Sequence, residues 1–599
     1  MADTVDVGPI LAVDVGNTRT KAVLLDAVEG RHRFVACADA ATTLRPPFDD
    51  VSLGAREAIA GVESVSGRVL LASNGPLLPQ RDNGSGVDCF VSTTSVGGPL
   101  RLLLVALSPA SGVHTMLRES GGYDALTVET VLFDGEAGNV GGRNRVSRGE
   151  RAQKRKKPRG EDMPAAPSGA VHTLVDRVLH ALEASQPHAI VIAGGAADPE
   201  TSGLLELGNA LAKDVTSPRP SILLVASIRE GELLRRVLDG KYEMRLLALG
   251  EGAIEVDRLL LWDEIRRFWR HGIVEGTPGY SLVRSWESEP VCHSAIGFGR
   301  VVRFLAKHHT APTWGIDFGA SYTRVFSANG NTSFAVSSVA GTGRGSINLL
   351  KSVWALRGRL PFELTGEEIE AVILNKWARP WTVPETREEL RLDAALATQA
   401  AREAMDGVGA AVYFPAEPRP GLVVATGGLL AGGTSPAQMA LAIMDALEPT
   451  GITELAVDTL SILPALGAVA SSHPQAAAEA LLSDGLTWLG TCIAGRGPAR
   501  LGEKAVVLEI KRSGQRPTKI DIPCGGLKLI PLARQDTIEL SIKPNSNLDF
   551  GWGRGRSGKI SVRGGKLGLV VDARETPLVP VGAEGRWSRV REWLEGMGA

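Results

Sequence analysis

A chain of 599 residues is too long for one hydrophobic core, so we expect two to four domains. Its 65 Lys and Arg residues nearly balance 67 Asp and Glu residues, and the net charge of -2 gives no general reason to bind nucleic acid or an anionic membrane. A content of 44% hydrophobic residues with 70 glycines indicates a folded α/β protein rich in turns rather than a disordered one.

The five cysteines do not form a recognisable framework. They are scattered without CxxC spacing, so neither a disulfide network nor a zinc site is indicated. The first residues, MADTVDVGP, are acidic where a signal peptide would be basic and then apolar, and the chain holds no run of 18 apolar residues. We therefore expect a cytoplasmic protein without a membrane-spanning segment.

The chain opens with a strand, a polar bend and a second strand, ILAVDVGNTRTKAVLLD at residues 10–26. Gly16 lets backbone N–H groups in the bend approach a ligand closely, which suits a polyphosphate. A carboxylate beside phosphate oxygens is tolerated only with a cation between them. Asp14 is therefore predicted to hold a Mg²⁺ ion by accepting hydrogen bonds from the water molecules bound to the ion. For one copy alone, a tight turn with a capping aspartate is an equal alternative.

A strongly basic stretch, residues 141–169, follows later in the first half of the chain. Nine Lys or Arg residues between positions 143 and 159 stand against one acidic residue, with glycines and prolines at both ends. We predict a disordered, solvated loop rather than an arm that binds nucleic acid or an acidic partner. A helical pattern at 169–185 and an apolar strand with a glycine pair, AIVIAGGAAD at 189–198, come next.

The opening pattern returns in TWGIDFGASYTRVFSANGN, residues 313–331. Asp317 and Gly319 stand in the same relation as Asp14 and Gly16. Two copies of one pattern predict two related α/β lobes whose hairpins clasp the phosphates of ATP from opposite sides, with Asp14 and Asp317 at the Mg²⁺ ion.

A second glycine-paired strand, GLVVATGGLLAGG at 421–433, follows the second hairpin. Gly427 and Gly428 would let a nucleoside lie flat against the backbone. From about residue 503 the pattern changes to short strands with glycine turns, which predicts an appended β-rich domain. We therefore divide the chain into a first lobe at 1–310, a second lobe at 311–500 and a C-terminal β-rich domain at 501–599.

Three shorter motifs are not predicted to be functional. GRGRSGKI at 553–560 has Ile560 where a P-loop needs Ser or Thr, and the SVRGG that follows is typical of a strand. GTGRG at 341–345 is a lone glycine run, which more often forms a turn, although its place in the second lobe allows it to lie near phosphate. The histidines of KHH at 307–309 lack partners at metal-ligand spacing.

The order of the two hairpins and the glycine pair resembles the actin-like (ribonuclease H-like) ATPase superfamily of sugar kinases, actin and the heat-shock chaperone ATPases. In that superfamily ATP lies in a cleft between two lobes. The resemblance implies, position by position, ATP-binding roles for three groups of residues. They are Asp14, Gly16, Asn17, Thr18, Thr20 and Lys21 in the first hairpin, Asp317, Gly319, Ser321 and Thr323 in the second, and Gly427 with Gly428 in the adenosine loop.

A narrower resemblance covers about residues 10–480. The segments VDVGNTRTKAVLLD, STTSVGGPLRLLLVAL, IVIAGGAAD, GIDFGASYTRVFS, VVATGGLLAG and LAVDTLSILPALGAVA, in this order, are similar to the MutL family associated with glutamate mutase, which is unrelated to the mismatch-repair protein of similar name. This implies an ATP-dependent reactivating chaperone that releases damaged cofactor from an adenosylcobalamin-dependent mutase, so that intact cofactor can rebind. Its partner would be that mutase, and an oligomer is compatible with the pattern.

One departure from the pattern bears on catalysis. Arg324 stands where related second hairpins end in an acidic residue, and residues 337–350 offer no carboxylate to position an attacking water. We therefore expect a weak ATPase, or nucleotide binding with little turnover.

Two other functions stay open at this stage. DVGNTRTK also resembles the opening of type III pantothenate kinases, so a small-molecule kinase is the main alternative, although those chains are less than half as long. A filament-forming relative of actin is the third.

Overall fold

The computed structural model describes residues 7–107, 125–132, 169–194, 198–213, 218–249, 258–330, 332–406, 419–431, 434–512, 514–575, 578 and 586–598. The chain forms two compact units. One comprises Met1–Pro99, Arg118–Asp124 and Trp269–Ala599, and the other Leu100–Leu117 and Ala125–Phe268. Apart from Gly169, the predicted basic loop at 141–169 lies outside the described residues.

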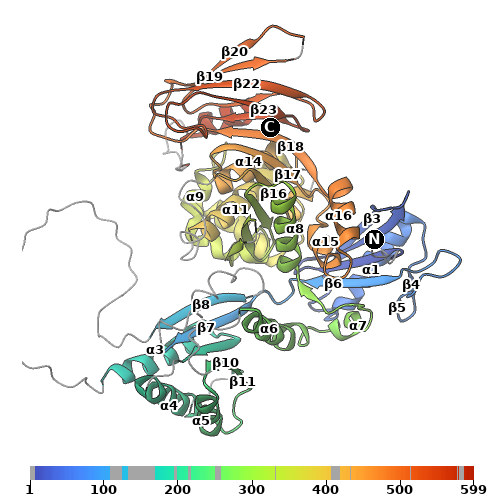
Figure 1. Ribbon diagram of the computed structural model, residues 1–599, viewed down its shortest axis with the longest axis vertical. Helices are drawn as coiled ribbons and strands as arrows, with labels where there is room; N and C mark the ends of the chain where they lie inside the picture. Colours follow the sequence, from blue (N-terminus) through green and yellow to red (C-terminus); the bar gives the residue numbers. More distant parts are fainter. Residues whose placement is uncertain are drawn as a thin grey trace, which may run out of the picture. The chain divides into compact units, whose positions relative to one another are not determined.

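The first lobe of the larger unit is built on a five-stranded sheet in the order β12-β6-β1-β2-β3 (Figure 1). The hairpin strands β1 and β2 and their neighbour β3 are antiparallel, whereas β6 and β12 run parallel to β1. The strands are β1 (Ile10–Val15), β2 (Arg19–Val28), β3 (Arg31–Ala41), β6 (Cys89–Thr94) and β12 (Cys292–His293). Three antiparallel strands followed by parallel ones is the ribonuclease H-like arrangement.

Short elements complete the first lobe. Helix α1 (Val51–Ser66) begins at Asp50, whose side chain accepts a hydrogen bond from the Ser52 backbone, and it ends at Gly67 in the left-handed conformation. The others are the small hairpin β4 (Leu71–Ala72) and β5 (Gly75–Pro76), the π-helical turn η2 (Arg270–Val274), and α7 (Tyr280–Arg284).

The second lobe repeats this topology. Its sheet has the order β15-β14-β13-β16-β17, again with three antiparallel strands and two that are parallel to the first, and it continues through β18, β24 and β21. The strands are β13 (Thr313–Phe318), β14 (Thr323–Asn329), β15 (Thr332–Ser338), β16 (Leu422–Thr426), β17 (Gly451–Val457), β18 (Thr487–Ala494), β21 (Leu527–Ile530) and β24 (Gly568–Asp572). The repeat confirms the predicted α/β fold with two actin-like lobes.

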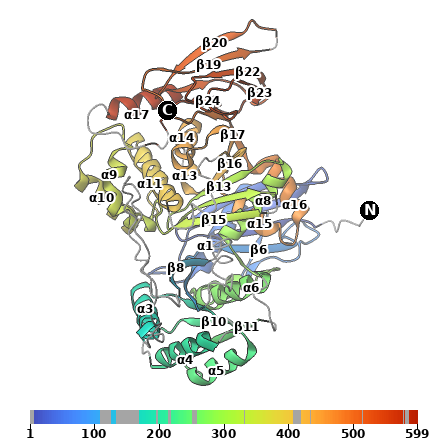
Figure 2. The same ribbon diagram turned by 60° about the vertical axis from the view of Figure 1, so that its left-hand side comes forward.

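Helices cover both faces of the second-lobe sheet. α11 and α14 pack side by side on one face, over a core that includes Trp314, Ile316 and Phe318 (Figure 2). Between β15 and β18 the described residues form the helical elements η3 (Arg344–Ser352), α9 (Val353–Arg357), α10 (Gly366–Ala378), α11 (Arg387–Met405), α13 (Gly428–Ala431), α14 (Pro436–Leu447), α15 (Leu463–Val469), α16 (Pro474–Ala480) and η4 (Leu481–Gly485). Burial on both faces explains why the central strands read as nearly continuous apolar runs.

The two lobes exchange helices. α8 (Ser294–His308) follows the first-lobe strand β12 but packs on β13 and β14, whereas α15 follows β17 but packs on β1 and β6, and α16 lies beside β3 (Figure 1). Where α8 meets α15, a Cβ atom at Gly467 would lie 1.8 Å from the Gly297 carbonyl oxygen. The crossing therefore requires glycine, and it joins the lobes into one unit.

The smaller unit contains a parallel sheet in the order β11-β10-β9-β7-β8. Its elements are β7 (Leu100–Ala106), β8 (Ala125–Leu132), α3 (Gly169–Ser185), β9 (Ala189–Ala193), α4 (Asp198–Lys213), β10 (Ser221–Ala226), α5 (Ile228–Leu238), β11 (Met244–Ala248) and α6 (Arg258–Trp269), whose last residue belongs to the larger unit. The strand of AIVIAGGAAD is β9, so it is not the first-lobe counterpart of β16. That counterpart is β6, which pairs with β1 as β16 pairs with β13.

The C-terminal segment is β-rich as predicted, but two of its strands extend the second-lobe sheet. β20 (Thr518–Pro523), β19 (Lys504–Lys511), β22 (Thr537–Pro544) and β23 (Gly558–Arg563) form a sheet of their own, and β21 and β24 join β18. Ile560 lies within β23, which confirms that GRGRSGKI is not a P-loop. The terminal helix α17 (Arg586–Met597) was not predicted. In the described ranges, no helix has the length and apolar character needed to cross a membrane.

The helix crossing yields a prediction about stability. Gly467→Ala places a methyl group against the Gly297 backbone, so the free energy of unfolding should fall by roughly 2–3 kcal/mol in urea titrations. Gly366→Ala is the matched control, because its nearest new neighbour is a Val353 methyl group at 3.7 Å. Equal free energies of unfolding for the two variants would show that α8 and α15 can accommodate a methyl group where they cross.

Candidate functional site

Both predicted hairpins end in four-residue bends. In the first, the Gly16 N–H donates to the Arg19 carbonyl at 3.0 Å, between the strand partners Val15 and Thr20. A Cβ atom at Gly16 would lie 2.6 Å from the Arg19 carbonyl oxygen, and one at Gly319 would lie 2.3 Å from the Tyr322 carbonyl oxygen. Each bend therefore closes only because glycine stands two positions after the aspartate.

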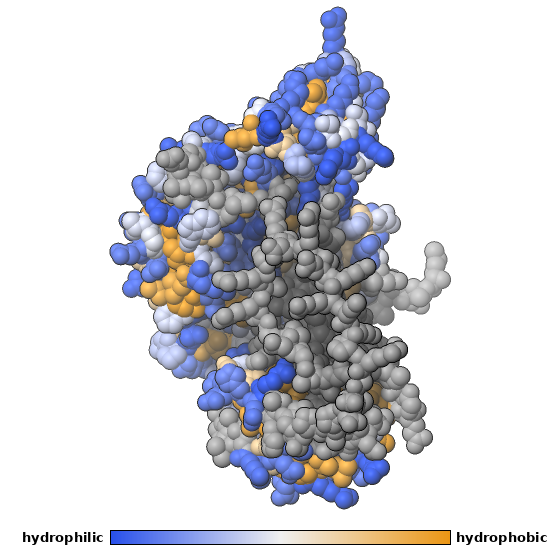
Figure 3. Space-filling model, turned by 90° about the vertical axis from the view of Figure 1, so that its left-hand side faces the viewer, coloured by the Kyte–Doolittle hydropathy of each residue, from blue (hydrophilic) through white to orange (hydrophobic). Residues whose placement is uncertain are grey.

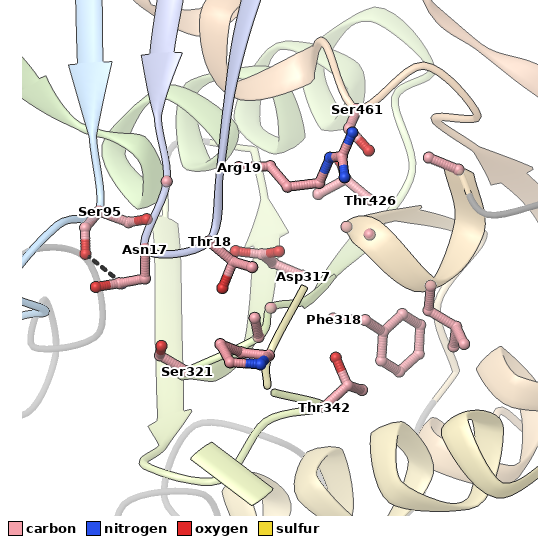
Figure 4. A pocket seen from close by; sticks show the side chains of 18 of the residues that line it. Asn17, Thr18, Arg19, Ser95, Asp317, Phe318, Ser321, Thr342, Thr426 and Ser461 are labelled. Atoms are coloured by element: carbon pink, nitrogen blue, oxygen red, sulfur yellow. Dashed lines mark hydrogen bonds between the residues drawn. The ribbon is translucent and has the colours of Figure 1, made fainter. Parts of the chain in front are cut away.

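The bends face a pocket of about 460 Å³ within the larger unit, a volume that suits a small-molecule ligand. Figure 4 shows Asn17 and Thr18 of the first bend, Ser321 of the second, and Asp317 around it. The structure brings ten predicted residues together here. They are Asp14, Gly16, Asn17, Thr18, Lys21, Asp317, Gly319, Ser321, Gly427 and Gly428.

The side chains of Thr20 and Thr323, for which we also predicted a role in nucleotide binding, do not line the pocket. Both are fully buried, and Thr20 Oγ1 lies 2.9 Å from Thr42 Oγ1. Side chains alternate between the two faces of a strand, so the next residues, Lys21 and Arg324, reach the pocket instead. The two threonines support the hairpins from behind.

Asp14 is held by two hydroxyl groups. Thr93 Oγ1 on β6 and Ser294 Oγ at the start of α8 each donate to Asp14 Oδ1 at 2.6 Å. Burial raises the pKa of Asp14, and these two hydrogen bonds oppose that shift. Both hydroxyl groups donate to the same carboxylate oxygen, and no side chain among the described residues donates to Oδ2.

Asp317 occupies the equivalent position in the second hairpin with less support. Burial raises the pKa of Asp317 to about 6, the neighbouring Arg324 opposes that shift, and Asp14 and Asp458 add to it. A carboxylate in such surroundings is stabilised by any cation that enters the pocket.

The sequence did not single out a further aspartate near the hairpins, Asp458, which is fully buried. It follows the apolar strand β17 and accepts hydrogen bonds from Thr426 Oγ1 at 2.9 Å and from the Leu463 N–H at 2.8 Å, which fixes the start of α15. Lys21 of the first lobe donates to the carbonyl of Leu460 in the same connection. The available signal was the one used for the hairpins, an aspartate at the end of a buried strand.

The glycine run GTGRG at 341–345 forms a loop that supports the second hairpin. The N–H groups of Thr342 and Gly343 donate to the carbonyls of Gly319 and Ala320 at 3.1 and 2.8 Å. A Cβ atom at Gly345 would lie 2.4 Å from the Ser321 carbonyl oxygen, so the loop packs directly on the bend. Thr342 also lines the pocket (Figure 4), which adds a hydroxyl group that the sequence did not single out.

The predicted adenosine loop closes another side of the pocket. Gly427 has a φ of +115°, and a Cβ atom there would lie 2.5 Å from the Phe318 carbonyl oxygen, whereas Gly428 faces open space. Pro380, Trp381 and Val383 also line the pocket. Trp381 and Val383 are 56% and 59% exposed and belong, with Trp354, Leu374 and Trp377, to the exposed apolar side chains of this part of the second lobe. Apolar residues gather at the height of α9 and α10 on the left of Figure 3.

Comparison with solved structures finds weak similarities. The chain is similar to acetone carboxylase in a nucleotide-free structure, with 10% identity, 86% of this chain and 81% of that chain covered, and a TM-score of 0.30. It is also similar to component A of (R)-2-hydroxyglutaryl-CoA dehydratase from Acidaminococcus fermentans, with 9% identity, 78% of this chain and 99% of that chain covered, and a TM-score of 0.27. A further similar structure is glycerol dehydratase reactivase, with 10% identity, 73% of this chain and 95% of that chain covered, and a TM-score of 0.26.

No curated protein matches the chain. A family model does, and its description is MutL protein. It matches residues 10–132 and 170–484, which include both hairpins, the glycine pair at 427–428 and the connection that holds Asp458. Because this match covers most of the sequence, the chain belongs to the MutL protein family.

Proposed function

We propose that this protein binds Mg²⁺–ATP in the pocket between its lobes and reactivates an adenosylcobalamin-dependent mutase of the glutamate mutase type, exchanging damaged for intact cofactor. The observation that carries the proposal is the pair of equivalent hairpins, each with an aspartate near the end of its first strand and a glycine-closed bend at one pocket. Membership of the MutL family, and the resemblance of the motifs to the proteins associated with glutamate mutase, support the choice of partner.

The residues at the bends fit a polyphosphate. Thr18 Oγ1 is buried at the pocket and has no hydrogen-bond partner among the described residues, so a phosphate oxygen would satisfy it. Ser321 and Thr342 add hydroxyl groups, and Lys21 and Arg324 add positive charge at the same place. These five side chains come from both lobes, so one phosphate chain would hold the lobes together.

The two carboxylates fit a hydrated magnesium ion. Among the described residues, no three His, Cys, Asp or Glu side chains form a metal-binding group, so the ion would draw most of its ligands from water and phosphate. A magnesium ion near Asp14 and Asp317 would supply the charge that lets phosphate oxygens approach two acidic side chains.

The opposite end of the pocket fits a nucleoside. Gly428 leaves space beside the backbone, and Trp381, Pro380, Val383 and Leu429 offer aromatic and aliphatic surfaces for a base. An adenine ring there would lie against the adenosine loop.

The carboxylates that line the pocket are already paired or engaged, which favours slow hydrolysis of ATP. Of the acidic side chains that line it, Asp39 pairs with Arg19, and Asp393 pairs with Lys376 at 2.8 Å. Asp14 and Asp317 would be engaged with the metal. No unpaired carboxylate among the described lining residues is then left to activate water, so ATP binding and release would drive the protein with little hydrolysis.

A reactivating chaperone needs two conformations with different affinities for nucleotide. The exchanged helices α8 and α15 cross at glycines and join the lobes, and the nucleotide would contact both hairpins. ATP would therefore favour the closed arrangement of the lobes, and its release the open one. Such a change of conformation can favour an open cofactor site in a bound mutase, which a small-molecule kinase does not require.

Removal of either carboxylate tests the site. Asp14→Ala and Asp317→Ala should each lower affinity for Mg²⁺–ATP, or its turnover, by ~10²-fold, because a group that positions charge at the phosphates is lost. Asp521→Ala, on the exposed surface of β20, is the control and should bind as the wild type does. Wild-type affinity in either pocket variant, measured by calorimetry, would contradict the two-hairpin site.

The pH dependence of stability tests the burial of Asp317. The folded pKa of about 6 lies above the ordinary value of 3.8, so the folded state holds an extra proton between these values and loses stability as pH rises through them. Without metal or nucleotide, Asp317→Asn removes this cost and should be more stable than wild type by about 1–2 kcal/mol at pH 8, after allowance for solvent in the pocket. The difference should shrink towards pH 4.

Urea unfolding at several pH values in EDTA measures this difference. Asp317→Asn that is no more stable than wild type at pH 8 would show that the carboxylate is already compensated in the metal-free protein.

Reactivation tests the function itself. The protein with Mg²⁺–ATP and fresh adenosylcobalamin should restore activity to an inactivated carbon-skeleton mutase of the same cell, and Asp14→Ala should not. No small metabolite such as pantothenate should be phosphorylated. Rapid phosphorylation of a metabolite by the protein alone, without effect on the mutase, would favour the kinase alternative.

A further inference from the structure

The chain first leaves the larger unit after Pro99 and returns to it for the last time at Trp269. The outgoing chain passes through a turn at Ser95–Gly98 and reaches β7 at Leu100, and the returning chain arrives at Trp269, the last residue of α6. These two ends meet, since Trp269 Nε1 donates to the Gly98 carbonyl at 3.3 Å. Trp269 is buried, with 1% of its surface exposed.

The first hairpin is hydrogen-bonded to this turn. Asn17 Nδ2, at the tip of the bend, donates to the Ser95 carbonyl at 2.7 Å (Figure 4), and the Gly98 N–H donates to the same oxygen at 3.1 Å. Ser95 N–H in turn donates to the Val15 carbonyl at 3.0 Å. Asn17 and Ser95 both line the pocket, so a ligand that moves the bend also moves the turn.

The second hairpin touches the same turn from the other lobe. Gly98 has a φ of +77°, and a Cβ atom there would lie 2.3 Å from the Tyr322 hydroxyl oxygen, so the phenol ring packs on the bare backbone. The Arg324 guanidinium lies over that ring, 5.4 Å from its centroid. Tyr322 and Arg324 also line the pocket.

Trp269 has a further connection to the acidic end of the pocket. The ring centroids of Trp269 and His293 lie 5.3 Å apart. His293 is buried, and its Nδ1 accepts a hydrogen bond from the Ala295 N–H and so caps α8. The next residue, Ser294, donates to Asp14. Both hairpins therefore contact the junction directly, and Asp14 is linked to it through Ser294 and His293.

We propose that the Ser95–Gly98 turn and Trp269 couple occupancy of the nucleotide pocket to the position of the smaller unit, with Asn17, Tyr322 and Trp269 as positioning residues. This rests on the proposed binding of nucleotide at the hairpins. A phosphate chain that draws the two bends together would also move the turn, because Asn17 of one bend and Tyr322 of the other contact it. Linkage makes the effect reciprocal, so a partner that holds the smaller unit in one position changes the affinity for ATP.

The test measures the smaller unit's response directly. Spin labels at Glu57→Cys on α1 and Arg236→Cys on α5, both exposed, report the distance between the units in the full chain, with Cys37 and Cys292 replaced by serine. In this labelled background, Mg²⁺–ATP should shift the distance distribution. Trp269→Phe keeps an aromatic ring but lacks the N–H donor, and should lose more than half of the shift while ATP affinity stays within about threefold.

The chain offers a matched control. Trp286 also donates from Nε1 to a backbone carbonyl, that of Asn74 at 2.8 Å, and packs against a glycine, Gly75, away from the turn. Trp286→Phe should keep the full shift. A shift of normal size in Trp269→Phe would overturn the proposal.

A second measurement does not depend on the variants' folding. In the labelled background with native Trp269, amide hydrogen exchange at residues 95–99 and 269–274 should slow when Mg²⁺–ATP binds. Bound nucleotide with neither a distance shift nor slower exchange would overturn the coupling and leave nucleotide binding intact. Failure of that protein to bind nucleotide at all would instead remove the proposed function on which the coupling rests.

Discussion

Asp14 and Asp317 set the main electrostatic constraint on this molecule. Each is the residue before the last of a central strand of its lobe, each lines the same pocket, and burial raises the pKa of both. A pair of carboxylates in such a place costs free energy in the absence of a cation. The hydroxyl donors on Asp14, the arginine beside Asp317 and the lysine between the lobes reduce this cost. They leave a site suited to a cation with a polyanion.

The rest of the larger unit keeps these two groups at one pocket. Duplicated sheets place the hairpins at equivalent positions, and the exchange of α8 and α15 fixes each lobe to the other. The GTGRG loop stiffens the second bend from below, and Asp458 fixes the start of α15. Glycines at the crossing allow close approach of the two helix backbones, so α8 and α15 join the lobes through tightly packed backbone.

The hairpins could be predicted from the sequence because their signals are local. Alternating apolar strands, an aspartate and a glycine two positions later define each bend without any distant contact. The same local logic correctly rejected a P-loop at Ile560 and indicated the C-terminal strands. It failed where the outcome depended on which sheet a strand joins: β9 has the same pattern as β16 but belongs to the smaller unit.

The partners that complete the site are distant in sequence. Thr93 and Ser294 reach Asp14 from β6 and α8, and the face on which Thr20 and Thr323 lie is set by strand register. The contact of Trp269 with Gly98 spans the whole smaller unit and has no signature in either segment.

The dependence of ATP affinity on free Mg²⁺ tests the central claim most directly. Two carboxylates at the phosphate end should repel bare ATP, so its Kd should rise more than tenfold when calorimetric titrations with Mg²⁺ are repeated in EDTA, a loss of about 1.4 kcal/mol or more. Equal or tighter binding of ATP in EDTA would contradict a pocket in which Asp14 and Asp317 face the phosphates through a cation.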